Sequence, residues 1–286
     1  MVGELTWRKR LLGLWMPLAL FGVVALFPFT WMAATSLKAN AELYDPKANP
    51  LTIRHPSLVH YVSLLQETNF LTWVANTMLV AVVATGISLL LGTMLAYPLA
   101  RMRFRGAPLL ALTVAVTYLV PQSLLFVPMA DLIGRLKLGN TLSAVMLTYP
   151  TLLVPFIAWL LMGYFKTVPK ELEEQAMIDG ASRWRAMTRV ILPLCMPGFI
   201  SAGIFAFTLA QNEFLYALLF LSRSDVRTVP IGVVGELIRG DAFYWGQLMA
   251  GALLGSVPVA LIYSFPIRNK ICSFGFSPIL PSLPGL

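Results

Sequence analysis

Six long stretches of this chain contain no Asp, Glu, Lys or Arg. They cover residues 11–37, 68–100, 106–130, 138–165, 190–212 and 242–267 of the 286 residues. The hydrocarbon core of a bilayer is about 30 Å thick, so a helix needs about 20 apolar residues to cross it. All six stretches exceed that length. Because a helix satisfies its own backbone hydrogen bonds in lipid, we predict an all-α, polytopic membrane protein with six transmembrane helices.

The composition excludes an ordinary soluble domain. Hydrophobic residues make up 58% of the chain and charged residues only 12%, whereas a soluble domain carries about 25% charged residues. The formal net charge is +8. In a soluble protein this charge would raise the question of nucleic-acid binding, but here basic loop residues that hold the cytoplasmic side explain it better. We expect membrane lipid, and no nucleic acid, as a partner.

The six predicted spans can be given bounds, and the first of them has an alternative interpretation. They run over residues 12–34, 71–97, 108–130, 141–163, 198–221 and 246–267. The first span follows Arg8, Lys9 and Arg10, so it could be a signal peptide. It is long for a signal core and five more spans follow, which favours an uncleaved helix. Prolines such as Pro121 and Pro155 recur within the spans; they fit either common membrane-helix usage or kinked helices that line a pathway.

The basic residues predict the orientation. With the N-terminus inside, the inside segments hold 13 of the 21 Lys and Arg residues, and the longer outside segments hold 8. Arg101, Arg103 and Arg105 lie in one short loop, and short loops determine topology most strongly. We therefore predict a cytoplasmic N-terminus over 1–11, a six-span transmembrane domain over 12–267, and a cytoplasmic tail over 268–286.

Several kinds of site find little support in the sequence. Cys195 and Cys272 indicate neither a disulfide framework nor a metal site. His55 and His60 fall in a predicted polar loop and are expected to be surface residues. The sequence contains no G-x-x-x-x-G-K-[ST] loop that could cradle phosphates, and no nucleophile and base stand out. We expect no catalytic residue, no metal and no cofactor in this chain.

The longest polar segment predicted to lie inside is residues 164–197. Pro169 suits the first turn of a helix, and the acidic residues that follow it suit a helix N-terminus. Gly180 can take the positive φ of a helix C-cap, and Ser182 can cap a second helix. We predict two short amphipathic helices around a glycine turn. On periodicity alone, a solvated loop, helices that lie on lipid, and a partner-docking loop all stay open.

The second of these helices shows an apolar pattern. Trp184, Met187 and Ile191 are expected on one face, with Arg185 and Arg189 on another.

The same segment contains a motif that is more specific than its apolar pattern. The run EQAMIDGASRWRAMTRVILP at 174–193 resembles the signature of ABC-importer permeases: E-A-A, three residues, glycine, nine residues, then I-x-L-P. The positions that match are Glu174, Ala176, Gly180, Leu192 and Pro193. Gln175 replaces the middle alanine and Val190 replaces an isoleucine. The resemblance covers most of the chain and is strongest to the carbohydrate importer type, which includes maltose-importer-like inner-membrane components.

Shorter runs extend the resemblance, and two departures limit it. N-E-F-L-Y-A-L at 212–218 and R-T-V-P-I-G at 227–232 fit the family. Gln211 stands where a tryptophan is usual. After about Phe265 the resemblance stops, and the tail lacks the short glycine-rich basic ending typical of the family. We hypothesise that this tail is not a native family tail, which sequencing of the coding DNA would test.

The resemblance implies a mechanism and partners. The 164–197 loop would be a coupling helix that docks on a separate ATPase subunit, where ATP and Mg²⁺ would bind. The expected docking residues are Glu173, Glu174, Ala176, Asp179, Gly180, Ala181, Leu192 and Pro193. The expected partners are a second, non-identical permease subunit, two ATPase subunits and an extracytoplasmic substrate-binding protein, all at the inner membrane of a prokaryote. The substrate would be a sugar or a related polyol.

One acidic residue lies inside a predicted span. Glu213 is costly to bury, so it is a functional candidate, although a helix-packing hydrogen bond would also explain it. Gln211, Asn212 and Tyr216 are weaker candidates for the translocation pathway.

Two rival functions remain at this stage. A proton-coupled carrier would need more intramembrane acids and bases than Glu213 alone, and often an inverted repeat. A membrane enzyme or an assembly scaffold is the other rival. A carrier works without an ATPase and an enzyme turns over alone, whereas a permease subunit needs its partners.

Overall fold

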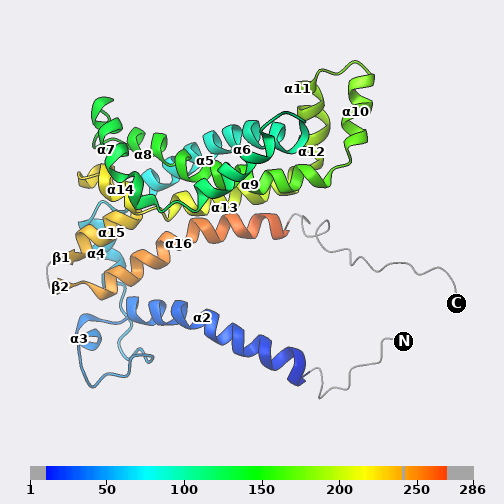
Figure 1. Cartoon of the computed structure of the whole chain (residues 1–286). Coiled ribbons are helices and arrows are strands. Elements are labelled where there is room, and N and C mark those ends of the chain that lie inside the picture. The colour runs from blue at the N-terminus through cyan, green and yellow to red at the C-terminus, as the bar shows by residue number, and fades with distance from the viewer. Residues whose placement is uncertain (1–10, 240–241, 269–286) are drawn as a thin grey trace. The chain divides into compact units, whose positions relative to one another are not determined.

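The structure is a computed structural model that describes residues 11–239 and 242–268. Its internal contacts divide the chain into two compact units, Met1–Leu71 with Gly232–Val257, and Thr72–Ile231 with Pro258–Leu286. Three helices run across the division: α5 (Phe70–Arg101), α15 (Val229–Leu237) and α16 (Trp245–Arg268) (Figure 1). Except for Leu11 and Arg268, the predicted N-terminal segment 1–11 and tail 268–286 lie outside the described residues.

The predicted membrane helices are present. Within the described residues, four helices are long and apolar enough to cross a membrane, over Gly13–Ser36, Phe70–Arg101, Leu142–Thr167 and Trp245–Ser264. Two more helix pairs pass the same test but are bent, Ala107–Tyr118 with Gln122–Arg135 by 97° and Arg183–Leu194 with Met196–Gln211 by 79°. The all-α membrane fold is therefore confirmed. The predicted number of six holds if each bent pair crosses as one span.

Two predicted spans are not continuous helices. In the span predicted over 108–130, α6 (Ala107–Tyr118) ends before Pro121, and the chain resumes as η2 (Gln122–Leu125) and α7 (Phe126–Arg135). Proline lacks an N–H and disfavours helix for the residue before it, which explains the break. The span predicted over 198–221 consists of α13 (Met196–Gln211) and a separate α14 (Leu215–Phe220). The helices therefore lie where the sequence predicts them. A kink at Pro121 was one of two interpretations, whereas the break between α13 and α14 was not predicted.

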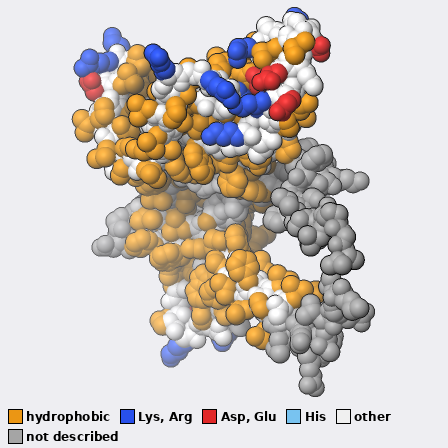
Figure 2. Space-filling view, turned by 45° about the vertical axis from the view of Figure 1, so that its right-hand side comes forward, with side chains coloured by type: hydrophobic (Ala, Val, Ile, Leu, Met, Phe, Trp, Pro, Cys, Tyr) orange, Lys and Arg blue, Asp and Glu red, His pale blue; other side chains and the backbone are white. Residues whose placement is uncertain are grey.

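The second unit holds the main hydrophobic core. Its remaining elements are α8 (Leu142–Thr148), α9 (Pro150–Thr167), α10 (Lys170–Ile178), α11 (Arg183–Ala186), the π-helix η3 (Met187–Ile191), α12 (Leu192–Leu194) and η4 (Ser224–Val226). Helix α9 packs against α6 and α13. Tyr149, Phe165 and Tyr216 are among the largest fully buried side chains. Apolar side chains also cover much of the visible surface (Figure 2), as expected where helices face lipid rather than water.

The first unit combines one long helix with a compact polar segment. It contains η1 (Leu11–Trp15), α2 (Met16–Ser36), α3 (Asn40–Leu43), α4 (Val59–Glu67), and the antiparallel pair β1 (Ile238–Arg239) and β2 (Ala242–Phe243). Lys38 Nζ donates to the carbonyls of Asn49 and Pro50 at 2.8 and 2.7 Å. The carboxylate of Glu42 accepts the backbone N–H groups of Arg54 and His55. These bonds compensate the burial of Lys38 and Glu42.

The expectation that His60 is a surface residue is wrong. His60 lies in α4 and is buried, and its Nε2 donates to the carbonyl oxygen of Lys38 at 3.0 Å. The ring lies so close to Gly246 that a Cβ there would be 2.2 Å from His60 Nε2. Burial lowers the pKa of His60, so the ring stays neutral at physiological pH. The amphipathic turn of α4 that buries His60 was not recognised in the sequence because it is short.

Gly92 of α5 should be sensitive to substitution. A Cβ at this position would lie 2.6 Å from Cγ2 of Ile157 on α9, and Ile157 is fully buried and cannot move away. Small residues of this kind let membrane helices approach closely. We expect Gly92→Ala to lower the stability of the chain in mild detergent by about 1–3 kcal/mol, the usual cost of overpacking. Thermal unfolding of the purified chain measures it.

Gly86 gives a matched control on the same helix. No atom lies within 4 Å of a Cβ built there, so Gly86→Ala should not lower stability. Equal losses in the two variants would contradict the close α5–α9 packing.

Candidate functional site

The polar 164–197 loop folds as two helices around a glycine turn, as predicted. Helix α10 ends in a Schellman motif: the Gly180 N–H donates to Met177 O at 3.1 Å, and the Ala181 N–H donates to Ala176 O at 3.0 Å. This motif requires a left-handed residue, and Gly180 has φ of 89°. Ser182 then caps α11 through its Oγ, which accepts the Arg185 N–H at 3.3 Å. The turn is therefore fixed by local backbone bonds and by the absence of a Cβ at Gly180.

Glu173 joins α10 to the end of α5. Its carboxylate accepts the hydroxyl hydrogen of Tyr97, and its Oε2 lies 3.4 Å from Nε of Arg101. The Glu173 and Arg101 side chains are only 7% and 2% exposed. Arg101 Nη1 also donates to Val168 O at 2.9 Å, just before α10. A buried carboxylate, a guanidinium and a hydroxyl thus hold the loop to the long helix α5.

The other expected docking residues lie differently. Glu174, Asp179, Gly180 and Pro193 are exposed, whereas Ala176, Ala181 and Leu192 are partly exposed. Glu173 alone among the predicted docking residues is buried. The structure places its carboxylate against Tyr97 and Arg101, away from the exposed surface of the loop. The acid-rich start of α10 could not show from sequence which of its glutamates faces inward.

Two apolar side chains of the loop are unusually exposed. Ile178, at the end of α10, is 84% exposed, and Trp184 of α11 is 60% exposed. Of the three residues predicted to share an apolar face, Met187 and Ile191 are buried, whereas Trp184 is exposed. The π-helix η3 begins at Met187 and changes the number of residues per turn. Ile178 was not singled out in the sequence, although it precedes Gly180 by two residues.

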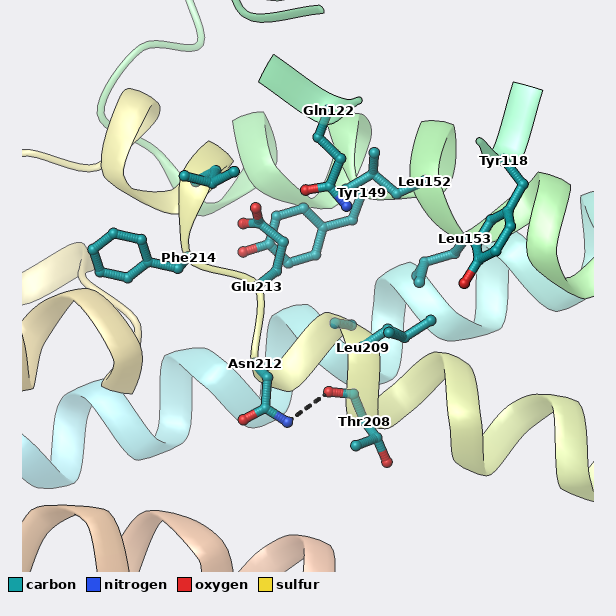
Figure 3. Close-up of a pocket in the computed structure, with 12 residues that line it drawn as sticks. Tyr118, Gln122, Tyr149, Leu152, Leu153, Thr208, Leu209, Asn212, Glu213 and Phe214 are labelled. Carbon is teal, nitrogen blue, oxygen red and sulfur yellow. Dashed lines mark hydrogen bonds between the residues drawn. The ribbon is translucent and has the colours of Figure 1, made fainter. Parts of the chain in front are cut away.

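A second candidate site is a cavity of about 390 Å³ within the second unit. Its polar lining comes from Tyr118, Gln122, Tyr149, Thr208, Asn212 and Glu213 (Figure 3). The cavity borders both helix interruptions, because Tyr118 and Gln122 flank the α6–η2 break and Asn212 and Glu213 lie between α13 and α14. Irregular backbone at membrane depth is tolerated where it lines a cavity.

The predicted pathway residues divide between this cavity and the core. Asn212 and Glu213 line the cavity, whereas Gln211 and Tyr216 are buried and are not part of the lining. Asn212 Nδ2 donates to Thr208 O at 2.9 Å. The Glu213 carboxylate accepts the N–H groups of Tyr216 and Ala217 at 2.9 and 3.1 Å. Glu213 therefore caps α14, which is one reason why an acid occurs at this depth.

Four polar lining residues were missed in the sequence. Tyr118, Gln122, Tyr149 and Thr208 are separated along the chain and carry no motif. Pro121, which was noted in the sequence, is the only nearby signal for Tyr118 and Gln122. Among the described residues, no group of three His, Cys, Asp or Glu side chains could hold a metal ion.

Long apolar helices, a structured polar loop at one end and a cavity at helix breaks are the architecture of a membrane transport subunit. The sequence matches the family described as the binding-protein-dependent transport system inner membrane component over residues 88–266. The chain therefore belongs to this family of transport permeases, and it is a transport component rather than an enzyme.

Individual relatives agree with this assignment. The chain is 37% identical over 244 residues to the sulfoquinovosyl glycerol transport system permease protein SmoH of Agrobacterium fabrum, covering 84% of both chains. It is 32% identical over 246 residues to the trehalose/maltose transport system permease protein MalG of Thermococcus litoralis, covering 85% of this chain and 87% of the relative.

Solved structures share the fold. A chain of a bacterial ABC transporter involved in the import of the acidic polysaccharide alginate superposes with a TM-score of 0.75 at 18% identity, covering 93% of this chain and 98% of that chain. A chain of the MetNI methionine ABC transporter gives a TM-score of 0.59 at 16% identity, covering 77% and 100%.

The Glu173 contact makes a testable prediction. Glu173→Ala leaves the buried Arg101 guanidinium and the Tyr97 hydroxyl without their carboxylate. Removing one partner of a buried ion pair costs about 3 kcal/mol or more. We expect a lower thermal unfolding midpoint and faster hydrogen exchange in the 168–180 segment of the purified chain.

Glu174→Ala is the control, because Glu174 is the next residue and is exposed. It should change stability by less than about 0.5 kcal/mol. If both variants behaved alike, Glu173 would not anchor α10.

Proposed function

We propose that this chain is one permease subunit of an ABC importer for a sugar or a related polyol. It pairs with a second, non-identical permease. Two ATPase subunits bind ATP and Mg²⁺ and dock on the 164–197 loop, and an extracytoplasmic binding protein delivers the substrate. Both termini lie in the cytoplasm of a prokaryotic cell, and the chain crosses the inner membrane several times.

The proposal rests mainly on the exposed face of the 164–197 loop, which Glu173 holds to α5. Ile178 and Trp184 present apolar surface next to the exposed acids Glu174 and Asp179. Exposed apolar groups within a polar rim are typical of protein interaction sites. Because Gly180 has no Cβ and Ala176 and Ala181 are small, a partner can approach the backbone of the turn closely. The buried Glu173 contact then transmits motion of the docked loop to α5.

The substrate class rests on the relatives and on the cavity. The relatives named above are described as permeases for sulfoquinovosyl glycerol and for trehalose and maltose. The cavity offers amide, hydroxyl and phenol groups from Gln122, Thr208, Asn212 and Tyr118. Such groups, set among apolar side chains, suit a ligand with many hydroxyls. The second permease would supply the opposite side of the pathway.

The rival proton carrier is less well supported. The carboxylate of Glu213 accepts two backbone N–H groups at the start of α14. An acid held in this way is suited to fix a helix end rather than to carry a proton across the membrane.

Ile178→Asp tests the docking loop. The side chain of Ile178 is 84% exposed, so the change should leave the isolated chain stable. At an interface it would bury an unpaired charge, which costs several kcal/mol. We expect the ATPase subunits to be lost from the complex purified from the native membrane, and transport to fall at least tenfold.

Leu51→Asp is the matched control, because Leu51 is also exposed, at 55%, and lies outside this loop. It should retain the ATPase subunits. A complex that keeps its ATPase subunits and transport with Ile178→Asp would contradict docking through this loop.

A further inference from the structure

A basic hollow lies at the end of the membrane helices that carries the polar loop. It has a volume of about 610 Å³ and is formed by the end of α5, the start of α6 and the end of α9. Its charged lining residues are Arg103, Arg105 and Lys166, with no acid among them. The rest of its wall is apolar, including Leu99, Ala107 and Ala111.

This combination of three cations with an apolar wall differs from the surroundings of ordinary basic loop residues. Cations that only determine topology face water, and they need no apolar wall. Here the three cations are exposed but surround a hollow whose apolar side belongs to the membrane helices α5 and α6. An occupant that matches both surfaces has an anionic head and an apolar body. Basic pockets between membrane helices at the cytoplasmic side bind anionic lipid head groups in this way.

A buried arginine that has one unbonded donor group in the described part of the chain lies next to the hollow. Met102 and Arg103 also line a second cavity, of about 320 Å³, together with Arg101. The Arg101 side chain is 2% exposed, and its Nη2 has no hydrogen-bond partner among the described residues. A buried donor without a partner is costly, so an anionic oxygen at this place would compensate it. Glu173 pairs with the charge of Arg101, so Arg101 contributes an unbonded Nη2 donor next to the hollow rather than a further free charge.

We propose that this hollow binds an anionic phospholipid of the inner leaflet. The phosphodiester lies among Arg103, Arg105 and Lys166, and the glycerol and first methylene groups lie along Leu99, Ala107 and Ala111. Arg101, through its contacts with Glu173 and Val168, links the lipid site to the loop. The lipid would thereby stabilise the arrangement of α5 and α10. This inference does not depend on the substrate or on the ATPase.

Native mass spectrometry of the full chain in detergent tests the proposal. The chain is titrated with phosphatidylglycerol and, separately, with phosphatidylcholine of the same acyl chains. We expect phosphatidylglycerol to bind about tenfold more strongly, since each basic residue near the headgroup contributes. In the triple variant Arg103→Gln, Arg105→Gln and Lys166→Gln, the two lipids should bind about equally well.

Two further variants make the result specific. Lys47→Gln with Arg54→Gln and Lys137→Gln removes three exposed cations elsewhere, and it should retain the preference. Ala111→Trp fills the hollow without changing its charge. It should weaken phosphatidylglycerol binding at least fivefold, whereas binding of a free anion would be unaffected.

Three results would overturn the proposal. The first is an unchanged lipid preference in the triple glutamine variant at Arg103, Arg105 and Lys166. The second is an equal loss in the triple control. The third is displacement of phosphatidylglycerol by millimolar inorganic phosphate with no effect of Ala111→Trp, which would indicate a small-anion site.

Discussion

The arrangement of this permease depends on one buried polar contact, that of Glu173 with Tyr97 and Arg101. Burying a carboxylate and a guanidinium is favourable only when each finds its partner, and here the side chains are 7% and 2% exposed. The contact determines where α10 lies relative to the end of α5. The position of α10 sets where the loop presents the exposed Ile178 and the exposed acids around it, whereas the Schellman turn at Gly180 is fixed by local backbone bonds. A loop held in this way can pass a displacement to a membrane helix instead of absorbing it.

The interruptions of the helices form the second constraint. Pro121 ends α6, and the segment around Glu213 separates α13 from α14. In lipid, freed backbone groups need partners, and the Glu213 carboxylate supplies them to Tyr216 and Ala217. The same breaks expose polar side chains to a cavity of about 390 Å³. The helix breaks and the polar lining of the cavity therefore arise together, and the acid at this place has a structural role as the cap of α14.

Much of this could be predicted from the sequence, and the exceptions have physical reasons. Charge-free stretches longer than 20 residues predict membrane helices because the thickness of the bilayer is fixed. Gly180 and Ser182 were placed correctly because turn and cap chemistry is local. The sequence could not show which of Glu173 and Glu174 is buried, because this depends on which side of α10 packs against the rest of the protein. Tyr118 and Tyr149 both line the cavity through tertiary packing alone, and no sequence signal distinguishes the exposed Trp184 from the buried Met187 and Ile191.

The measurement that tests the central claim most directly is the distance between α10 and α5 during the transport cycle. Spin labels at Gln175 and Met94, both exposed, would be followed by pulsed electron spin resonance in the assembled importer, with and without ATP. If Glu173 holds the loop to α5, the mean distance between the labels should stay constant to within about 2 Å. In the Glu173→Ala variant, the distribution of distances should become broader. A change of a full helical turn, about 5 Å, in the wild-type chain would contradict the account, because α10 would then move independently of α5.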